Sequence, residues 1–313
     1  MSAMPLPPEV AHLPILESEP WLQVGIDPMG ILEGPAFDRE GNLYLCFTGP
    51  RVSPHRILRI AHGTQEIATV YSSIPGELNP CGIAIHRDHR IFIAGLAGKI
   101  TIINPEGGWL QDLDLTYGGE SQPANDLVFD GSGNLYFTDF RGTLVEPKGG
   151  IYRMDASAGY GGSHKVLGGL AAPNGISFSP SGDTLWIGET GRNRIIRIDL
   201  APDGLTPMPV DGITCPFQST GGPGGPDSNK VDSEGNLYQC MVRQGRVIVL
   251  NRFGVPVANV VVPGREDGLA LATTNLAFKP GTREAYLMTA GEGGPCVHRF
   301  SGLAPGLTLY SHS

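Results

Sequence analysis

The chain has 313 residues, a formal net charge of -9 at pH 7 and 40% hydrophobic residues. The negative charge argues against nucleic acid or an anionic membrane surface as a partner. No apolar run approaches the about 18 residues that a membrane-spanning helix needs. A small-molecule ligand is therefore the expected partner.

The N-terminal sequence, MSAMPLPPEVAHLPILESEP, has no basic segment and no sustained apolar segment after it. We therefore expect no secretory signal, and we expect residues 1–18 to form an N-terminal arm. The five cysteines are odd in number and show no CxxC spacing; they are Cys46, Cys81, Cys215, Cys240 and Cys296. This pattern favours reduced thiols in a cytoplasmic protein over a disulfide framework.

A unit of two β-rich runs around a polar turn recurs along the chain, and its copies begin 44 to 53 residues apart. In chain order the six copies are EGPAFDREGNLYLCF from Glu33, CGIAIHRDHRIFIA from Cys81, NDLVFDGSGNLYFTD from Asn125, NGISFSPSGDTLWIGE from Asn174, DSNKVDSEGNLYQCM from Asp227 and TNLAFKPGTREAYLM from Thr274. Two apolar runs that flank a turn of Gly, Asn or Asp are typical of an antiparallel hairpin. Self-similarity at this period indicates a repeat architecture.

A third extended run follows each hairpin, as in HRILRIA and NRIIRIDL, and a more variable fourth run follows most of these. The pattern predicts an all-β fold: one six-bladed β-propeller over residues 1–313, with four antiparallel strands per blade. No stretch without Gly or Pro exceeds twelve residues, and that stretch lacks helical periodicity. Either WLQVGI near the N-terminus or GLTLY near the C-terminus would supply the outer strand of the last blade.

The repeat register predicts a site at one end of the central channel. The first strand of each blade lines that channel, so the six opening residues gather at one end of it. Four of them carry side-chain oxygen, namely Glu33, Asn125, Asn174 and Asp227. Carboxylate and amide oxygens without a nearby His suit a hard cation, and Ca²⁺ accepts six to eight oxygens in flexible geometry. Another divalent cation is an open alternative, as is a purely structural role for these turn-forming residues.

Antiparallel order places the loops between second and third strands, and the linkers between blades, at the same end. Such loops over a rigid scaffold often bind ligands. The candidates for shaping a substrate pocket are His55, Glu120, Gln122, Phe140, Arg141, Phe217 and Arg243. For each of them, a solvated loop residue is the alternative interpretation.

Several longer stretches carry a resemblance to a known family. They are NDLVFDGSGNLYFTDFRG, PKGGIYRM, NGISFSPSGDTLWIGETGRNRIIRI, GGPDSNKVDSEGNLY, GRVIVLNRFGVPV and PGREDG. Together they resemble the SMP-30/gluconolactonase/luciferin-regenerating family of six-bladed propellers. The resemblance implies a calcium-dependent lactonase.

The resemblance also implies roles for individual residues. Glu33, Asn174 and Asp227 match the family's metal ligands, and Ser228 matches a serine that lies at the metal in one branch. Asn125 matches a residue that is a metal ligand in some relatives and a substrate contact in others. Sugar-lactonase relatives often have Arg two residues before that Asn, where this chain has Pro123, so the resemblance does not extend to an aldonolactone substrate. Some members hold a second, structural calcium, for which the resemblance indicates no ligands here.

The predicted reaction is the opening of a lactone ring by water. The metal would polarise the carbonyl oxygen, and Asp227 would act as general base or as nucleophile. Asn125, Glu120, Phe140, Arg141 and Phe217 are the candidates for substrate binding. One alternative is hydrolysis of a phosphotriester or fluorophosphate at the same site. Another is a non-catalytic propeller whose calcium only locks the channel.

Overall fold

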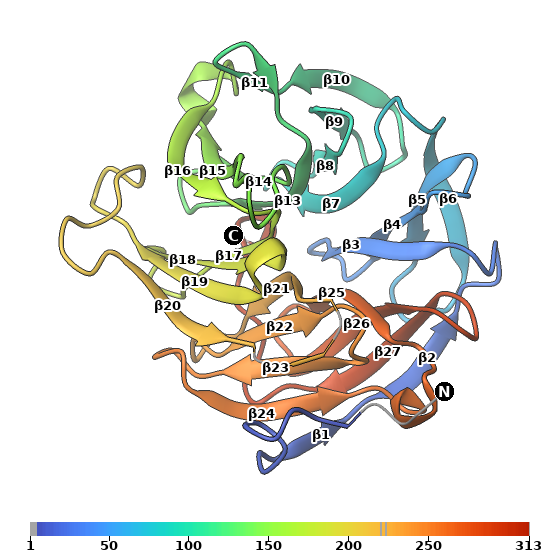
Figure 1. Cartoon of the computed structure of the whole chain (residues 1–313). Coiled ribbons are helices and arrows are strands. Elements are labelled where there is room, and N and C mark those ends of the chain that lie inside the picture. Colours follow the sequence, from blue (N-terminus) through green and yellow to red (C-terminus); the bar gives the residue numbers. More distant parts are fainter. Residues whose placement is uncertain (1–4, 220, 223, 313) are drawn as a thin grey trace.

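Six antiparallel sheets surround a central channel in the computed structural model, which describes residues 5–219, 221–222 and 224–312. The first strand of each sheet lies nearest the channel and the last lies at the perimeter (Figure 1). This arrangement confirms the predicted six-bladed β-propeller with four antiparallel strands in each blade.

The strands of the first three blades follow one another along the chain. Blade one contains β3 (Ile31–Phe37), β4 (Leu43–Thr48), β5 (His55–Ile60) and β6 (Ile67–Ser73). Blade two contains β7 (Pro80–Ile85), β8 (Ile91–Gly95), β9 (Lys99–Ile103) and β10 (Trp109–Asp114). Blade three contains β13 (Ala124–Phe129), β14 (Leu135–Asp139), β15 (Gly149–Met154) and β16 (His164–Leu170).

The last three blades continue this order until the final strand. Blade four contains β17 (Pro173–Phe178), β18 (Thr184–Glu189), β19 (Arg194–Asp199) and β20 (Ile213–Gln218). Blade five contains β21 (Pro226–Val231), β22 (Leu237–Met241), β23 (Arg246–Leu250) and β24 (Pro256–Val261). Blade six contains β25 (Ala272–Phe278), β26 (Glu284–Ala290), β27 (Cys296–Ser301) and, from the N-terminus, β2 (Glu19–Gln23).

The N-terminal segment closes the ring. β2 pairs antiparallel with β27, with Leu22 opposite Val297, while β1 (Ile15–Glu17) adds a parallel fifth strand beside β24. Of the two segments proposed to complete the last blade, the one containing Trp21 and Leu22 therefore supplies the outer strand.

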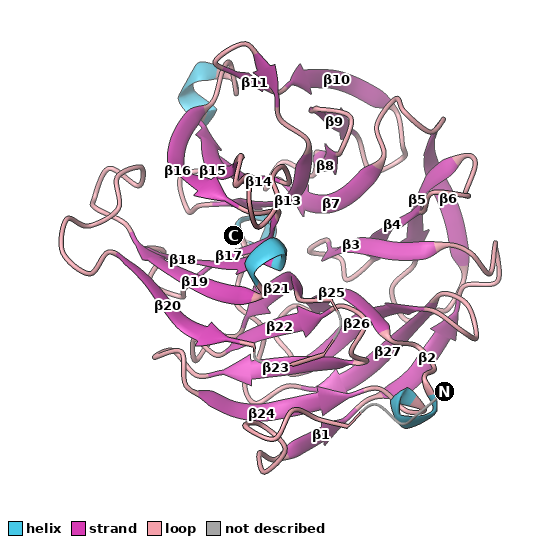
Figure 2. Cartoon of the chain, in the orientation of Figure 1, coloured by secondary structure: helices cyan, strands magenta, loops and turns pink. Residues whose placement is uncertain are grey.

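Helix is confined to four short 3-10 turns in the described chain (Figure 2). They are η1 (Ala156–Ala158), η2 (Thr190–Arg192), η3 (Arg265–Asp267) and η4 (Tyr310–His312). A two-stranded hairpin of β11 (Thr116–Tyr117) and β12 (Glu120–Ser121) stands between blades two and three. None of the helices that the structure describes has the length and apolar character to cross a membrane.

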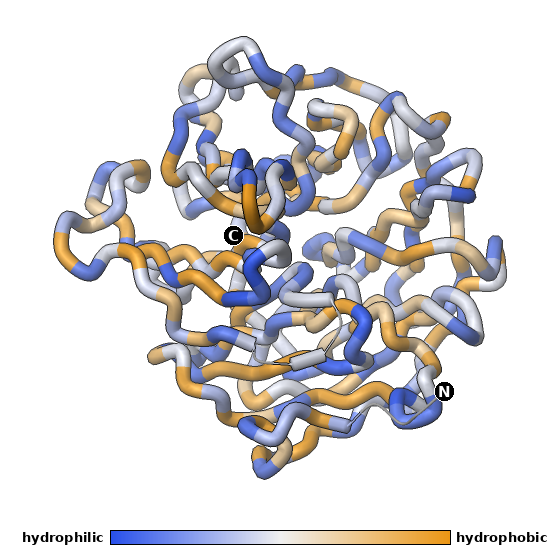
Figure 3. The backbone as a smooth tube through the Cα atoms, in the orientation of Figure 1, coloured by the Kyte–Doolittle hydropathy of each residue, from blue (hydrophilic) through white to orange (hydrophobic). Residues whose placement is uncertain are grey.

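The hydrophobic core is divided among the interfaces between neighbouring blades. Each interface holds one cluster of buried side chains, and the apolar segments follow the strands while polar segments follow the turns (Figure 3). Fully burying one Leu, Ile or Phe side chain contributes about 1.5–3 kcal/mol. The blades are thus held rigidly, which fixes the positions of the strand ends around the channel.

Candidate metal and active site

A bulge interrupts the pairing of the first two strands at or directly after the opening residue of every blade. The register shifts between Glu33 and Ala36, Pro80 and Gly82, Ala124 and Leu127, Pro173 and Ile176, Pro226 and Asn229, and Thr273 and Leu276. A bulge leaves residues without a partner on the neighbouring strand and re-aims their side chains. Blades three to six therefore present a pair of consecutive residues, rather than a single one, at the same end of each first strand: Asn125–Asp126, Asn174–Gly175, Asp227–Ser228 and Thr274–Asn275. In the described part of blade two, the bulge leaves only Cys81 without a partner on the neighbouring strand.

Glycine lets the first strands approach one another closely at this end. A Cβ added to Gly175 would lie 2.6 Å from the Asn229 nitrogen and 2.7 Å from the Asp227 carbonyl oxygen. A Cβ added to Gly82 would lie 2.6 Å from the Asn125 carbonyl oxygen. No real Cβ tolerates such contacts, so the glycine after Cys81 and after Asn174 allows the six openings to converge.

Asn174, Asp227 and Ser228 form one hydrogen-bonded group between blades four and five. The Asn174 side chain hydrogen-bonds to the Asp227 carboxylate, and the Ser228 hydroxyl donates to Asn174 Oδ1 over 3.3 Å. All three residues are buried. Burial raises the pKa of Asp227, the Asn174 hydrogen bond opposes that rise, and the charge of Asp126 adds to it.

Glu33 lies within electrostatic range of this group from the first blade. Burial raises the pKa of its carboxyl well above the ordinary value, and the negative charges of Asp227 and Asp126 raise it further. Its Oε2 accepts a 3.3 Å hydrogen bond from the Gly34 backbone N–H. Two buried carboxylates that repel each other favour either protonation or a bound cation.

Asp126 was not identified from the sequence, because only the first residue of each copy was considered. It is buried beside Asn125, and its Oδ2 accepts a 3.2 Å hydrogen bond from Lys230 Nζ of blade five. Within the described residues, no side-chain hydrogen bond engages the Asn125 amide, which leaves its oxygen available to a ligand.

The other two opening residues contribute no free oxygen. Thr274 Oγ1 donates to the Leu32 carbonyl over 2.6 Å and so ties blade six to blade one. Burial raises the pKa of the Cys81 thiol well above its ordinary value, and the charges of Glu33 and Asp227 raise it further. Cys81 is therefore a neutral thiol beside the carboxylates.

A buried polar network holds the backbone behind the donor side chains. Thr138 Oγ1 donates to the Asn174 carbonyl over 2.7 Å. Gln239 Nε2 donates to the Asp227 carbonyl over 2.7 Å, and Gln239 Oε1 accepts from Asn229 over 3.0 Å. These contacts fix the first strands of blades four and five independently of any ligand.

Two of the predicted substrate residues, Glu120 and Arg141, are joined to each other. Arg141 Nη1 lies 2.7 Å from Glu120 Oε2, and its Nη2 lies 2.8 Å from Asp139 Oδ2. Asp139 is fully buried at the end of β14 whereas Glu120 is exposed. Hydrogen bonds to Asp139 raise the pKa of Arg141, so the guanidinium is fixed in place over blade three.

The remaining predicted pocket residues do not lie together, and they differ in how far they are buried. Phe140 is half-buried next to Arg141 and donates its backbone N–H to the Pro123 carbonyl over 2.8 Å. Phe217 packs instead in the cluster between blades four and five with Trp186 and Ile195. The environments of the other three differ: Gln122 and His55 are buried, and Arg243 is exposed.

The donor set is chemically suited to a hard cation. In the described part of the chain, no group of three or more His, Cys, Asp or Glu could hold a metal ion. A cation at this end would therefore depend on amide and hydroxyl oxygens beside Glu33 and Asp227. Such mixed oxygen sets are typical of Ca²⁺ sites rather than of Zn²⁺ sites.

Fold and site together define a six-bladed propeller with buried carboxylate, amide and hydroxyl groups at one end of its channel. A family model for the SMP-30/Gluconolactonase/LRE-like region matches residues 31–291. The chain belongs to this family. It is 36% identical over 317 residues to lactonase drp35 of Staphylococcus saprophyticus, covering 99% of this chain and 94% of that protein.

Solved structures share the fold at much lower sequence identity. A luciferin-regenerating enzyme superposes with a TM-score of 0.73 at 17% identity, covering 93% of this chain and 99% of that one. Regucalcin from Agrobacterium tumefaciens, described as a calcium-binding protein, gives a TM-score of 0.70 at 20% identity and covers 94% and 98%. These two similarities concern the fold alone.

Proposed function

We propose that the protein is a calcium-dependent lactonase whose active site is the group of openings around Glu33, Asn125, Asn174, Asp227 and Ser228. The observation that carries the proposal is the charge at this end of the channel. Three carboxylates, Glu33, Asp126 and Asp227, interact there, and Lys230 supplies one positive charge through Asp126. When these four groups are ionised, three negative charges and one positive charge leave a net charge of −2, which one divalent cation would neutralise.

Two further observations support lactone hydrolysis. The family match spans residues 31–291, and the 36% identity to a lactonase extends over nearly the whole chain. The five cysteines are all unpaired, and four of them are buried, which is the state expected in a reducing compartment. We therefore place the proposed enzyme in the cytoplasm, with a small lactone or ester as substrate.

Glu33, Asn174, Asp227 and Ser228 would hold the cation, with Asn125 as a further ligand or a substrate contact. A bound Ca²⁺ would supply Lewis acidity toward the lactone carbonyl oxygen. Asn174 keeps the Asp227 carboxylate oriented through their hydrogen bond. The surrounding strands exclude bulk water from the donor atoms, since all five residues are buried.

Asp227 is the proposed base. Its carboxylate would take a proton from the attacking water as the new carbon–oxygen bond forms, after which the ring carbon–oxygen bond breaks. The leaving alkoxide takes up that proton, and the product is a hydroxy acid, which then releases its carboxyl proton to solvent. In the variant, the Asp227 carboxylate attacks the acyl carbon, the ring carbon–oxygen bond breaks to give an anhydride and an alkoxide that takes a proton from water, and hydrolysis of the anhydride restores Asp227. Arg141 and Phe140 would border the substrate, whereas Glu120 would act through Arg141.

Replacing Asp227 by Asn tests this role. Turnover of dihydrocoumarin should fall about a thousandfold, because a positioned general base contributes about 10²–10⁴ in rate. Asp211→Asn is the matched control, since Asp211 is exposed and its φ of 54° suits Asn. An Asp227→Asn protein that folds, retains calcium by elemental analysis and hydrolyses the lactone at the full rate would remove Asp227 from the mechanism.

A substrate panel separates the alternatives at the same site. Dihydrocoumarin, an aldonolactone and a phosphotriester should be assayed side by side, with and without a chelator. We expect chelator-sensitive hydrolysis of the aromatic lactone. Faster hydrolysis of the phosphotriester would favour the phosphotriesterase alternative. No hydrolysis of any compound, with a chelator-dependent melting temperature, would identify a non-catalytic calcium-binding propeller.

A further inference from the structure

The opposite end of the channel holds a cavity of about 870 Å³. The last residue of each first strand lines it: Phe37, Ile85, Phe129, Phe178, Val231 and Phe278. It therefore lies at the other end of the same six strands from the proposed metal site. Its volume is within the range of about 300–1,000 Å³ that is usual for small-molecule sites.

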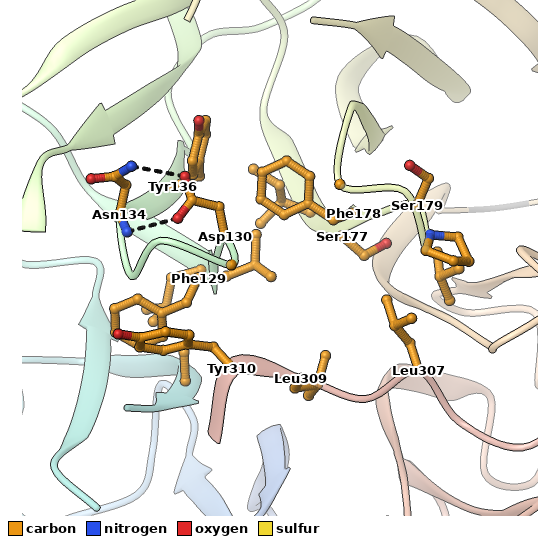
Figure 4. Close-up of a pocket in the computed structure, with 18 of the residues that line it drawn as sticks. Phe129, Asp130, Asn134, Tyr136, Ser177, Phe178, Ser179, Leu307, Leu309 and Tyr310 are labelled. Atoms are coloured by element: carbon orange, nitrogen blue, oxygen red, sulfur yellow. Dashed lines mark hydrogen bonds between the residues drawn. The ribbon is translucent and has the colours of Figure 1, made fainter. Parts of the chain in front are cut away.

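The walls of this cavity are largely apolar. Figure 4 shows Phe129, Phe178, Leu307, Leu309 and Tyr310 around the opening. The last three belong to the C-terminal segment, which is anchored at both ends of the cavity. Its Leu307 N–H donates to the Val231 carbonyl over 3.3 Å, and His312 Nε2 lies 3.2 Å from the Phe37 carbonyl oxygen.

The acidic residues at the rim are already engaged in their own turns. The Asp130 carboxylate accepts two hydrogen bonds of 2.9 Å, one from the backbone N–H of Asn134 and one from the side-chain amide of Asn134. Asp203 accepts from the backbone N–H groups of Leu205 and Thr206, at 2.8 and 2.9 Å. The third acid, Asp183, accepts from the hydroxyls of Ser179 and Ser181. These carboxylates disfavour a multiply charged anion.

Lys230 supplies a positive charge on the inner wall. It lines the cavity one residue before β21 ends, and its side chain is 18% exposed. Within the described residues, its Nζ makes one hydrogen bond, at 3.2 Å to Asp126 Oδ2. An ammonium has three N–H donors, so two remain for a ligand in the cavity.

We propose that this cavity binds a small monocarboxylate with an apolar body. The carboxylate accepts hydrogen bonds from Lys230 Nζ, which it shares with Asp126, and the apolar body lies against Phe129, Phe178 and Leu309. Because the cavity offers one ammonium group and has three carboxylates at its rim, it should bind a ligand with one negative charge in preference to a ligand with two. The site lies at the other end of the channel from the proposed metal ligands and is linked to them through the Lys230–Asp126 ion pair. It does not depend on the proposed lactonase activity.

Calorimetric titration with 4-phenylbutyrate, and with 4-phenylbutan-1-ol as its neutral counterpart, tests the proposal. The acid should bind, and the alcohol should bind about 10- to 100-fold more weakly, since a charge-assisted hydrogen bond is worth about 1.5–3 kcal/mol. Lys230→Met should weaken binding of the acid by a similar factor and leave binding of the alcohol unchanged. Equal affinities for acid and alcohol would overturn the role of Lys230, and no binding of either would overturn the site.

A second variant keeps the test decisive if Lys230→Met fails to fold. Leu309 is an exposed residue of the cavity wall, so Leu309→Glu places a negative charge at the mouth and should abolish binding of the acid. Leu303→Glu is the matched control, because Leu303 is equally exposed a few residues before that segment but lies outside this cavity. Binding should persist in EDTA. Binding that EDTA abolishes and Leu309→Glu leaves intact would assign the acid to the metal end and overturn the proposal.

Discussion

The two ends of the channel are built from the same six strands and differ in almost every chemical respect. Near their starts the strands carry buried carboxylates, amides, a hydroxyl and a thiol, and they end at four phenylalanines, an isoleucine and a valine. In every blade the opening residue precedes the last residue of the strand by four positions, so at about 3.3 Å per residue the two sets of side chains are about 13 Å apart along the strand. Burial therefore has different consequences at the two ends. At the end with Glu33 and Asp227 it strengthens the repulsion between carboxylates, whereas at the end with the phenylalanines it leaves an apolar cavity.

The comparison shows how one repeat supports two kinds of surface. At the polar end the bulges and close glycines bring the backbones together, so the side chains meet and interact. At the apolar end the last residues of the strands line a cavity, and the C-terminal segment of Leu307–His312 lies across it. A charged group is costly to bury without a partner. The carboxylates at the polar end are therefore stabilised by a bound cation or by protonation, whereas the described residues that line the cavity at the apolar end include no buried charge that requires a ligand.

The largest effect should come from removing a carboxylate at the polar end. Glu33→Gln would leave the proposed cation with one carboxylate ligand, and loss of Lewis-acid stabilisation worth several kcal/mol corresponds to about a thousandfold in turnover. Calcium content measured by elemental analysis should fall in parallel.

Glu234→Gln is the matched control, because Glu234 is an exposed residue of the β21–β22 turn at the other end. The comparison between the ends would fail if Glu33→Gln retained both calcium and turnover, or if Glu234→Gln lost them.

Close approach at the polar end should be sensitive to a single methyl group. Gly175→Ala would place a Cβ 2.6–2.7 Å from the backbone of residues 227–229, and overpacking of this kind costs about 1–3 kcal/mol. Urea unfolding should show this loss of stability. Gly131→Ala is the control, since a Cβ there meets no atom within 4 Å; equal effects of the two changes would refute the close-packing argument.

Much of this architecture could be predicted from the sequence because its signals are local and repeated. The hairpin pattern gave the blades, and the common register identified Glu33, Asn125, Asn174 and Asp227 as residues at one end of the channel. The glycine after Asn174 resembles an ordinary turn signal, yet it lies inside β17 and serves close strand approach.

Other features depend on contacts between distant segments, which no local pattern reports. The Asp126–Lys230 pair joins residues 104 positions apart across blades three and five. Phe217 belongs to a strand whose length and register follow an irregular linker, and it packs inward with Trp186. The closing strand was ambiguous because both chain ends carry a short apolar run, and only pairing with β27 distinguishes them.

A buried histidine away from both ends should give the protein a separate pH dependence. His298 lies in β27, where burial lowers its pKa to about 4, and its Nδ1 lies 3.1 Å from Thr289 Oγ1. The unfolded chain binds a proton near pH 6.5, so it holds more protons than the folded chain between pH 6.5 and 4. Stability is therefore complete above pH 6.5 and falls as the pH decreases, by about 1–2 kcal/mol at pH 5.

His298→Gln should flatten this part of the pH profile of the free energy of unfolding. His12→Gln, at an exposed position, should leave it unchanged. If His298→Gln and the parent protein lose stability in parallel between pH 7 and pH 5, the loss originates elsewhere. The result would show how much acid sensitivity remains to be explained by the carboxylates at the polar end.

The smallest effect should come from Glu120, at the outer margin of the polar end. Its ion pair with Arg141 is exposed on the Glu120 side, and exposed pairs contribute about 0–1 kcal/mol. Arg141 would keep its contacts with Asp139, at 2.8–3.0 Å. Glu120→Gln should therefore change the free energy of unfolding by less than about 0.5 kcal/mol and change KM for dihydrocoumarin by less than about threefold. A tenfold rise in KM at unchanged stability would instead show that Glu120 contacts the substrate directly, which would extend the polar site outward from the channel to the β11–β12 hairpin.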